Sequence, residues 1–294
     1  MSASTITDER RQPATDAAHI ARLARAEKRA DRIELIVVWA LALLWIAPLA
    51  YVFWVALREP AVALSFEPFS GWTLSNIAHI WEQGNFARYY INTTILVVGL
   101  TITQLVLACL AAYAFARYRF PAHEFLFVVV LLQLLIFPEV LLPETFALVA
   151  RMGLADTIPG IAIPYAASAF AIFLIRQAFK SVPKELVEAA EVEGASRLEV
   201  LWKVYIPLAK PTLMAFTLIS VSFHWNNFLW PLVITRSPEV RPITVGIVRF
   251  LSPETGINFT ALTAGTVITI LPLLVVFTLM QRTFIQSFMR SGIK

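Results

Sequence analysis

Six long apolar runs, separated by short polar segments, dominate the 294-residue sequence. A helix needs about 20 apolar residues to cross the hydrocarbon core of a bilayer, which is about 30 Å thick. Each run reaches that length, so the pattern predicts an all-α membrane protein with six transmembrane helices. We place these spans at 33–57, 91–115, 125–149, 160–179, 211–235 and 263–285.

Prolines make the third and fourth spans less regular than the others. Pro138 and Pro143 fall in the third run and Pro164 in the fourth. Proline is tolerated in membrane helices where neighbouring groups satisfy the freed carbonyls.

The first run is too long for the apolar part of a secretion signal, about 7–15 residues, and lacks a small-residue cleavage site. We therefore expect it to be retained as a helix.

The composition agrees with a membrane protein. Hydrophobic residues make up 58% of the chain, charged residues only 15%, and the mean hydropathy is +0.70. Soluble domains are usually about 45–50% apolar and about 25% charged. The formal net charge of +4 would suggest nucleic acid in a soluble protein. In a membrane protein, basic residues on the cytoplasmic side explain it better, so we expect no nucleic-acid partner.

Most of the 24 Lys and Arg residues fall on the same side of the predicted membrane as the N-terminus. Basic residues gather in cytoplasmic segments, so this bias predicts that both termini are cytoplasmic. We expect residues 1–32 to form a cytoplasmic tail, residues 33–290 the six-helix membrane domain, and residues 291–294 a cytoplasmic end. The polar segment 181–211 then also faces the cytoplasm.

Segment 181–211 is patterned as two short helices that meet at a glycine. Pro183 stands where the first helix would begin, because proline is favoured in a first helical turn. Gly194 stands where that helix would end, in the left-handed position that commonly terminates helices. Ser196 and Glu199 have the spacing of a capping box, which predicts the start of the second helix.

The second helix of this segment has a bulky apolar side, and Pro207 and Pro211 lead from it into the fifth span. Ala189 and Ala190 on the first helix are small enough for a partner backbone to come close. Amphipathic helices lying on the lipid surface would give a similar periodicity. A DNA-reading helix-turn-helix is disfavoured because the first helix is acidic and the segment is held between two spans.

The residues "EAAEVEGAS…VYIP" in this segment resemble the EAA loop in the membrane subunits of bacterial ABC importers. The family pattern is E-A-A, three residues, G, nine residues and I-x-L-P. The residues from Glu188 to Ala190, Gly194 and Pro207 fit this spacing. Val204 and Ile206 replace the usual Ile and Leu of the pattern.

Other stretches carry the same resemblance from about residue 35 to the end. They are "YINTTILVV", "LAAYAFARYRFP", "FLIRQAFKSVPKELVEAA", "HWNNFLWPLVI" and "MQRTFIQSFMRSGIK". Together they are similar to the carbohydrate-class permeases, the maltose-permease-like group. They are also similar to the second permease of sn-glycerol-3-phosphate importers.

The resemblance implies the ABC importer permease fold, with six transmembrane helices and a cytoplasmic helix–turn–helix coupling loop, in a bacterial cytoplasmic (inner) membrane. It implies a second permease as heterodimer partner, two ATPase subunits below and an extracytoplasmic solute-binding protein above. The loop would dock in a cleft of the ATPase. The residues to which the resemblance gives this ATPase-coupling role are Glu188, Ala189, Ala190, Glu193, Gly194, Ala195 and Pro207.

The sequence itself contains no sign of catalysis. It has no phosphate-binding G-x-x-x-x-G-K loop, so ATP and Mg²⁺ are expected on the partner ATPase and no cofactor on this chain. The four histidines are scattered without metal-ligand spacing, and we interpret them as structural. We expect no catalytic residue and no metal site.

Polar residues deep in the spans are the candidates for a translocation path. A charged group at mid-span costs about 2.5–3.5 kcal/mol on insertion scales. If the third span is straight, Glu139 lies about 21 Å along it and Glu144 about 28 Å, near the outer interface. In a straight fifth span, Trp225, Asn226 and Asn227 lie at about 20–24 Å. We predict that Glu139 and these three residues line the path; hydrogen bonds between helices are the alternative.

The function predicted is one half of the translocation path of an ATP-driven importer for a sugar or related polyol. An importer of the sn-glycerol-3-phosphate type is an alternative, although no Lys or Arg lies deep in a span. A second alternative is an ion-coupled secondary transporter with Glu139 as proton site, which would leave the coupling loop unexplained. A third is a membrane scaffold that recruits a soluble partner through the loop. The outer segments 236–258 and 58–90 are long enough to reach a binding protein.

Overall fold

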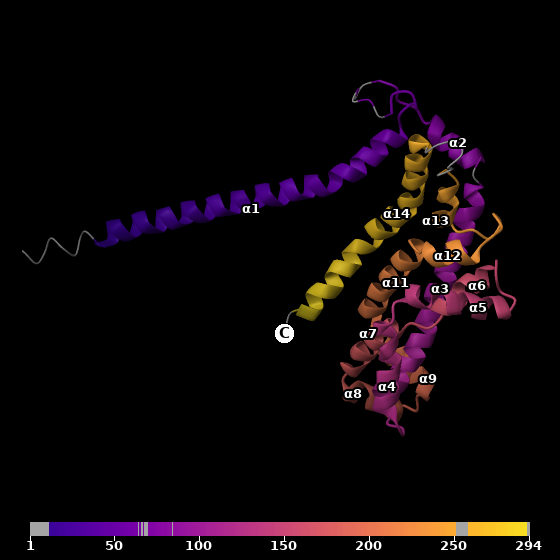
Figure 1. The fold of residues 1–294 in the computed structure, drawn as a ribbon. Helices are drawn as coiled ribbons and strands as arrows, with labels where there is room; N and C mark the ends of the chain where they lie inside the picture. The colour runs from indigo at the N-terminus through magenta and orange to yellow at the C-terminus, as the bar shows by residue number, and fades with distance from the viewer. Residues whose placement is uncertain are drawn as a thin grey trace, which may run out of the picture. The chain divides into compact units, whose positions relative to one another are not determined.

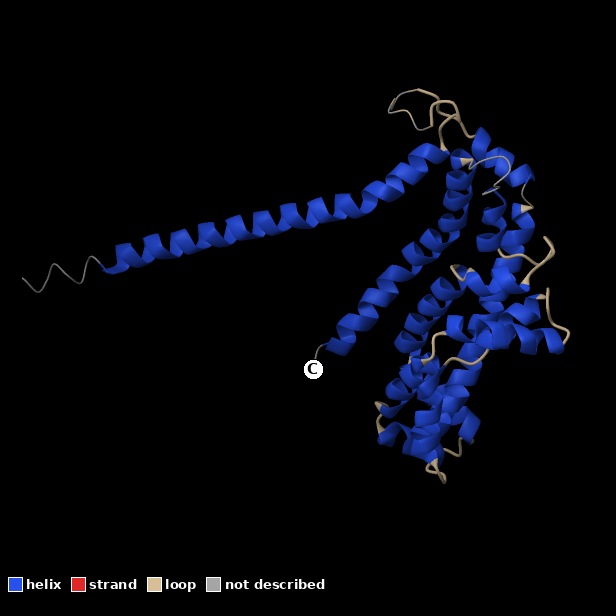
Figure 2. Cartoon of the chain, viewed as in Figure 1, coloured by secondary structure: helices blue, strands red, loops and turns tan. Residues whose placement is uncertain are grey.

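The computed structural model describes residues 12–63, 65, 67, 70–83, 85–250 and 258–292. The chain divides into two compact units, residues 1–54 and 55–294. Helices connected by loops make up both, as Figure 2 shows, and the described ranges contain no β-strand beyond an isolated bridge between Arg58 and Trp72. The predicted all-α class is confirmed.

Nearly all of the first unit belongs to a single helix, α1, which runs from Gln12 to Ala56. Its part from Glu27 to Ala56 is long and apolar enough to cross a membrane. Nearly all side chains described in this part of the unit are exposed, as expected for a helix that faces lipid. α1 covers the predicted first span, 33–57, to within one residue and extends it toward the N-terminus.

The second unit is a bundle of helices of very unequal length (Figure 1). Its α-helices are α2 (Ser75–Gln83), α3 (Phe86–Arg117), α4 (His123–Leu132), α5 (Leu142–Arg151), α6 (Ile158–Ala162), α7 (Ala169–Lys180), α8 (Lys184–Val192), α9 (Arg197–Val200), α10 (Ile206–Leu208), α11 (Lys210–Trp225), α12 (Leu229–Ile234), α13 (Ile243–Gly246) and α14 (Phe259–Gly292). The 3₁₀ turns η1 (Gln133–Leu135), η2 (Pro138–Leu141), η3 (Ile163–Tyr165) and η5 (Ile247–Phe250) and the π-helical turn η4 (Leu201–Tyr205) complete it.

Three described helices can each cross a membrane alone, and up to six spans result if each bent helix pair counts as one. The three are the apolar part of α1, all of α3, and α14 from Phe259 to Leu279. The bent pairs are His123–Leu135 with Pro138–Arg151 at 87°, Ile158–Tyr165 with Ala169–Lys180 at 49°, and Arg197–Leu208 with Lys210–Trp225 at 77°.

The predicted third span, 125–149, is wrong as a straight helix. The chain leaves helical geometry at Ile136 and Phe137, whose backbones are extended, and Pro138 begins a new element turned by 87°. Proline lacks the N–H that would continue the first helix, which explains the position of the break. The depths expected for Glu139 and Glu144 along a straight helix therefore do not hold.

The fourth and fifth predicted spans are also interrupted. In the fourth, α6 and η3 are separated from α7 by Ala166–Ser168, so its expected irregularity is confirmed. In the fifth, α11 ends at Trp225 and α12 begins at Leu229, which places Asn226 and Asn227 in the gap. The depth of these two residues along a continuous helix was therefore also misjudged.

Polar side chains satisfy backbone groups that the breaks leave without helical partners. The Gln104 amide on α3 donates to the Tyr165 carbonyl at 2.7 Å, and the Gln133 side-chain oxygen accepts from the Ala169 N–H at 2.9 Å. Ser168 caps α7 by accepting from the N–H of Ala171. Hydrocarbon offers no water to such groups, so these bonds allow the chain to bend at membrane depth.

The main core lies around α3 and α7, where small residues allow the helices to approach closely. Ala108 and Ala112 of α3 and Ala171 of α7 are almost completely buried there. Small residues at helix interfaces are the usual means of close packing in membrane proteins. The same core includes residues of segment 181–211, so we call this end of the bundle the loop end.

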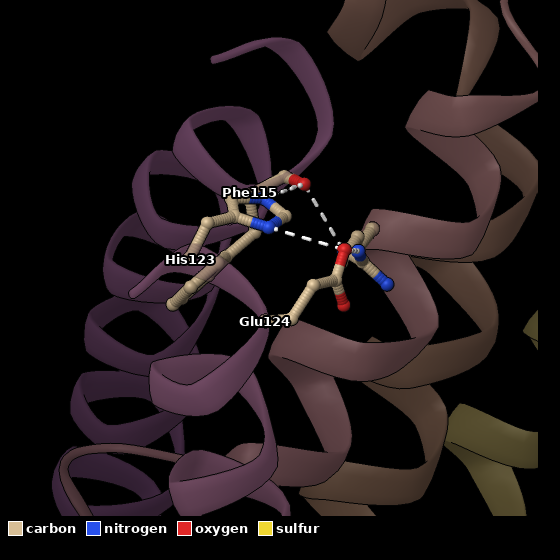
Figure 3. A network of polar contacts seen from close by, with 4 residues as sticks. Phe115, His123 and Glu124 are labelled. Carbon is tan, nitrogen blue, oxygen red and sulfur yellow. Dashed lines mark hydrogen bonds and ion pairs between the residues drawn. The ribbon is translucent and has the colours of Figure 1, made fainter. Parts of the chain in front are cut away.

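A polar cluster ties three helices together at the loop end. Arg176 of α7 is 4% exposed; its Nε donates to the Phe115 carbonyl at 3.0 Å, and its guanidinium lies 3.9 Å from the centre of the Phe127 ring. His123 of α4 donates to the same carbonyl and lies 3.2 Å from the Glu124 carboxylate, as Figure 3 shows. The cluster therefore fixes the end of α3 against α4 and α7.

At the opposite end of the bundle, Asp156 holds the segment after α12. Its carboxylate accepts from the backbone N–H groups of Arg236 at 2.8 Å and Ser237 at 3.0 Å. Burial opposes ionisation of this carboxyl, but the two N–H donors outweigh it, and the pKa of Asp156 is lowered. Nearby, the Asn92 amide donates to the carbonyls of Glu239 and Arg241.

We expect Arg176→Met to destabilise the protein by about 1–3 kcal/mol, because the Phe115 carbonyl loses one of its two donors and Glu124 loses the guanidinium 3.9 Å away. Arg119→Met is the matched control, since Arg119 is exposed and should change stability by less than about 0.5 kcal/mol. Thermal unfolding of the detergent-purified protein measures both. Equal unfolding midpoints for the two variants would contradict the role given to the cluster.

We expect Asp156→Ala to lower stability by about 1–2 kcal/mol, because two N–H groups lose their acceptor and alanine tolerates the left-handed backbone at Asp156 (φ 58°) poorly. Asp156→Asn should cost less. Because the pKa of Asp156 is lower in the folded protein than its ordinary value of 3.8, the carboxylate stabilises the fold fully above that value. This stabilisation is lost as the pH falls through the folded-state pKa. The difference between wild type and Asp156→Ala should thus stay constant from about pH 8 to about pH 5; a difference that shrinks in that range would refute this account.

Candidate functional site

The first helix of segment 181–211, α8, ends in a glycine-terminated turn. Gly194 has φ +85°, a left-handed backbone that L side chains rarely adopt. Its N–H donates to the Glu191 carbonyl and the Ala195 N–H to the Ala190 carbonyl, both at 3.0 Å. This is the Schellman pattern of helix termination, and the predicted role of Gly194 in the turn is confirmed.

The second helix of the segment begins with the predicted capping box. Glu199 N–H donates to the Ser196 hydroxyl at 3.4 Å, and Ser196 N–H donates to the Glu199 carboxylate at 2.9 Å. From Arg197 the chain stays helical through α9, η4 and α10 to Leu208. Lys203 pairs with Glu199 one turn away, at 2.8 Å. The two helices therefore meet at a short, well-ordered corner; we call Lys184–Leu208 the two-helix loop.

The two-helix loop is part of the bundle core. Val187 of α8 is 2% exposed, and Val200, Leu201 and Tyr205 are buried in the same cluster as residues of α3 and α7. The Tyr205 ring lies 5.1 Å from the rings of both Tyr113 and Phe179. Such a buried aromatic contact leaves the loop little freedom to move independently of the spans.

Two polar contacts reinforce this attachment. The Tyr113 hydroxyl donates to the Arg197 carbonyl at 3.0 Å, and Arg117 pairs with Glu191 at 2.7 Å. Both partners on the bundle side belong to α3, the long helix at the centre of the core. A displacement of the loop must therefore move α3 and α7 with it.

The predicted coupling residues divide into an exposed and an inward-facing set. Glu188, Ala189, Glu193 and Gly194 are exposed, and Pro207 is exposed farther along, in α10. The structure packs Ala190 and Ala195 against the protein's own core instead, which explains their small size without a second protein.

Sequence reasoning did not single out Val192, which is more exposed than any other large apolar side chain described in the loop. Val192 is 89% exposed at the last position of α8. An apolar residue is unusual at such a position in solvent, and its place between Glu191 and Glu193 was the available signal. It lies beside the exposed acidic residues and extends the surface that the loop presents.

A second candidate site is a cavity of about 790 Å³ lined by residues from the breaks in the predicted third, fourth and fifth spans, at 136–137, 166–168 and 226–228. Phe137 and Pro138 come from the first break, Ala167 and Ser168 from the second, and Asn227 from the third. We call it the break cavity. Its other polar lining residues include Gln104, Gln133, Glu139, Tyr165 and Ser220.

The break cavity brings together two of the four residues predicted to line a path. Glu139 and Asn227 both line it. Trp225 does not: the residue is 7% exposed, and its indole N–H donates to the Thr269 carbonyl of α14 at 3.0 Å. Asn226 is exposed, donates to the Ser222 carbonyl, and is also outside the lining. Stacking of Trp225 on a sugar is therefore not available in this conformation.

Aromatic residues that the sequence did not single out line the cavity instead. They are Phe137, Tyr165, Phe170, Phe216, Phe223 and Trp230. Their convergence depends on the 87° turn and the other breaks, which no periodicity indicated.

His224 forms part of a buried network beside the cavity. The Gln104 amide donates to its Nε2 at 3.1 Å, Ser220 donates to the Gln104 oxygen at 2.8 Å, and Thr101 lies 2.9 Å from Ser220. The network joins α3 to α11. Among the residues that the structure describes, no group of three or more His, Cys, Asp or Glu side chains could hold a metal ion.

Comparison with known proteins gives consistent matches. The arabinooligosaccharides transport system permease protein AraQ of Halalkalibacterium halodurans is 33% identical over 239 residues, 81% of this chain and 85% of that protein. The sn-glycerol-3-phosphate transport system permease protein UgpE of Yersinia pestis is 32% identical over 223 residues, 74% of this chain and 79% of that protein.

A solved structure has the same fold. It is a chain of a bacterial ABC transporter involved in the import of the acidic polysaccharide alginate, 26% identical, with a TM-score of 0.79 over 88% of this chain and 98% of that chain. A family model for the inner membrane component of binding-protein-dependent transport systems matches residues 104–290. The match spans more than half of the sequence and includes the two-helix loop and the break cavity. The chain therefore belongs to the family of inner membrane components of binding-protein-dependent transport systems, the permease subunits of ABC importers.

Proposed function

We propose that this chain forms one half of the translocation path of an ABC importer for a sugar or related polyol, paired with a second, different permease. The observation that carries the proposal is the two-helix loop: an exposed, acidic helix end joined to the spans through a buried core. Relatives that carry arabinooligosaccharides and sn-glycerol-3-phosphate support the substrate class.

The loop is proposed to transmit motion from the ATPase to the spans. Glu188, Ala189, Glu193 and Gly194 would contact the ATPase cleft, where carboxylates can pair with basic residues. Ala190, Ala195 and Pro207 would shape the loop and its exit. Because Val187, Tyr205 and their neighbours lie in one core with α3 and α7, closure of the ATPase would tilt these helices as a unit. ATP and Mg²⁺ would bind the two ATPase subunits, and this chain would carry no cofactor.

The proposed topology has six spans, both termini and the two-helix loop in the cytoplasm, and lipid around the outside. The outer segments 58–90 and 236–258 would then face the solute-binding protein. In support, the described start of the second segment is held firmly by Asp156, Asn92 and Thr93. A fixed platform of this kind suits a surface on which another protein docks repeatedly.

The runner-up is an importer for sn-glycerol-3-phosphate, since UgpE is nearly as similar as AraQ. An ion-coupled transporter with Glu139 as proton site is disfavoured, because a self-sufficient transporter has no use for an exposed loop built into its core.

We predict that the tagged chain purifies from its native membrane with an ATPase and a second permease, and that Gly194→Trp reduces the recovered ATPase at least tenfold. The indole would project from the loop where nothing lies within 4 Å of the glycine. Gly153→Trp is the matched control, because Gly153 also has a left-handed backbone, φ +71°, with open space around it. It lies beyond α5, away from the loop end. Mild-detergent purification with quantitative mass spectrometry measures both.

Three results would count against the proposal. If the wild-type chain purifies without an ATPase, the chain does not work as an importer subunit. If Gly153→Trp loses the ATPase as severely as Gly194→Trp, backbone strain rather than a blocked surface explains the loss. If Gly194→Trp retains the ATPase and ATP-dependent uptake, the loop is not the docking surface.

A further inference from the structure

The break cavity is built where three helix interruptions meet. Irregular backbone at membrane depth is tolerated where it lines a cavity or is buried in protein, and secondary transporters commonly place substrate sites at broken helices. Here the extended residues at Phe137, the gap at Ala167–Ser168 and the gap at Asn227 all contribute to one wall. Its volume, about 790 Å³, falls in the range of about 300–1,000 Å³ that is typical of ligand sites.

Most polar groups of the cavity wall already have partners. Gln104 bonds the Tyr165 carbonyl, Ser220 and His224, and Gln133 bonds the Ala169 N–H. Glu139 differs: within the described part of the chain, no hydrogen bond or ion pair engages its carboxylate. It lies close enough to Tyr165 to interact electrostatically, and Asn227 contacts the same tyrosine side chain. A carboxylate, a phenol and an amide thus gather at one place with hydrogen-bonding capacity to spare.

The charge of the wall selects against anions. None of the lining residues is Lys or Arg, and Glu139 is the ionisable acid among them. A phosphate or carboxylate group would meet the negative charge of Glu139 with no lining cation to offset it, and like charges repel. A hydroxyl group, by contrast, can donate to a carboxylate and both donate to and accept from an amide.

The aromatic lining residues suit the apolar C–H face of a sugar ring. The exposed rings of Phe137 and Phe223 and the buried Trp230 are among the lining residues. The C–H face of a pyranose or furanose ring is apolar and can lie on such rings while its hydroxyl groups reach a polar edge. Aromatic walls with a few convergent polar groups are typical of small-molecule sites.

We infer that this chain contributes its own substrate subsite, the break cavity, and that the subsite takes an uncharged sugar through Glu139, Tyr165 and Asn227. The inference rests on the proposed importer function and narrows it: it assigns a neutral cargo and excludes sn-glycerol-3-phosphate and acidic oligosaccharides. The competing occupant is a segment of the second permease that fills the cavity in the assembled importer.

The test is protection from a thiol reagent, for which the chain is well suited because Cys109 is its only cysteine and is buried. Asn227→Cys and the control Asn226→Cys are made in a Cys109→Ala background. Position 226 is adjacent and exposed but outside the cavity lining. The complete importer, with its ATPase, second permease and binding protein, is labelled in proteoliposomes with a small methanethiosulfonate.

The probes are arabinotriose, maltotriose and diacetylchitobiose, which are neutral, and sn-glycerol-3-phosphate and an alginate trisaccharide, which are anionic. We expect a neutral probe to be taken up and to slow labelling at position 227 at least fivefold, with less than a twofold effect at position 226. Glu139→Gln should lower uptake of that probe at least tenfold, whereas Glu144→Gln, also at an exposed position but outside the cavity lining, should leave it within twofold.

The possible failures are distinct. If the wild-type importer takes up no probe in an ATP-dependent manner, the proposed function fails and the inference fails with it. If uptake is ATP-dependent but selects only the anionic probes, the importer function stands and the inference is overturned. If a neutral probe is taken up while position 227 is unlabelled throughout, or labels at the same rate with and without sugar, the second permease fills the cavity and the subsite is not here.

Discussion

A peptide group in hydrocarbon has no water to bind, so each N–H and C=O must find a partner within the protein. α3 meets this condition as an uninterrupted helix of 32 residues, and the rest of the bundle packs around it. The helices beside it are interrupted, and the backbone groups at the interruptions need other hydrogen-bond partners. Gln104 and Gln133 provide them by bonding the backbone at the break between η3 and α7. The bundle can bend at these places only because polar side chains stand there.

The same condition connects the two candidate sites. The broken helices leave a space lined with amide, phenol and carboxylate groups, the break cavity. At the loop end, α3, α7 and the two-helix loop form a dense core that contains Val187 and Tyr205. α3 and α7 run between both places. A push on the loop therefore reaches helices that border the cavity, which is the mechanical arrangement an ATP-driven permease needs.

The sequence predicted the features that depend on neighbours in the chain. The capping box at Ser196 and the left-handed turn at Gly194 follow from local backbone chemistry, and both are confirmed. The 87° turn before Pro138 was not foreseen, because proline indicates a break and not its angle. Trp225 was misjudged for a similar reason: its burial against α14 depends on a contact distant in the sequence. Local signals fixed the elements, and tertiary packing decided which polar residues share a cavity.

The central claim is that the two-helix loop docks on an ATPase. The most direct measurement is the labelling rate of Val192→Cys in a Cys109→Ala background, since Val192 is 89% exposed at the end of α8. A membrane-impermeant maleimide is added from the loop side, to the permease pair alone and to the complete importer. The account predicts rapid labelling in the pair and at least tenfold slower labelling once the ATPase is bound. Equal rates in the two assemblies would contradict it.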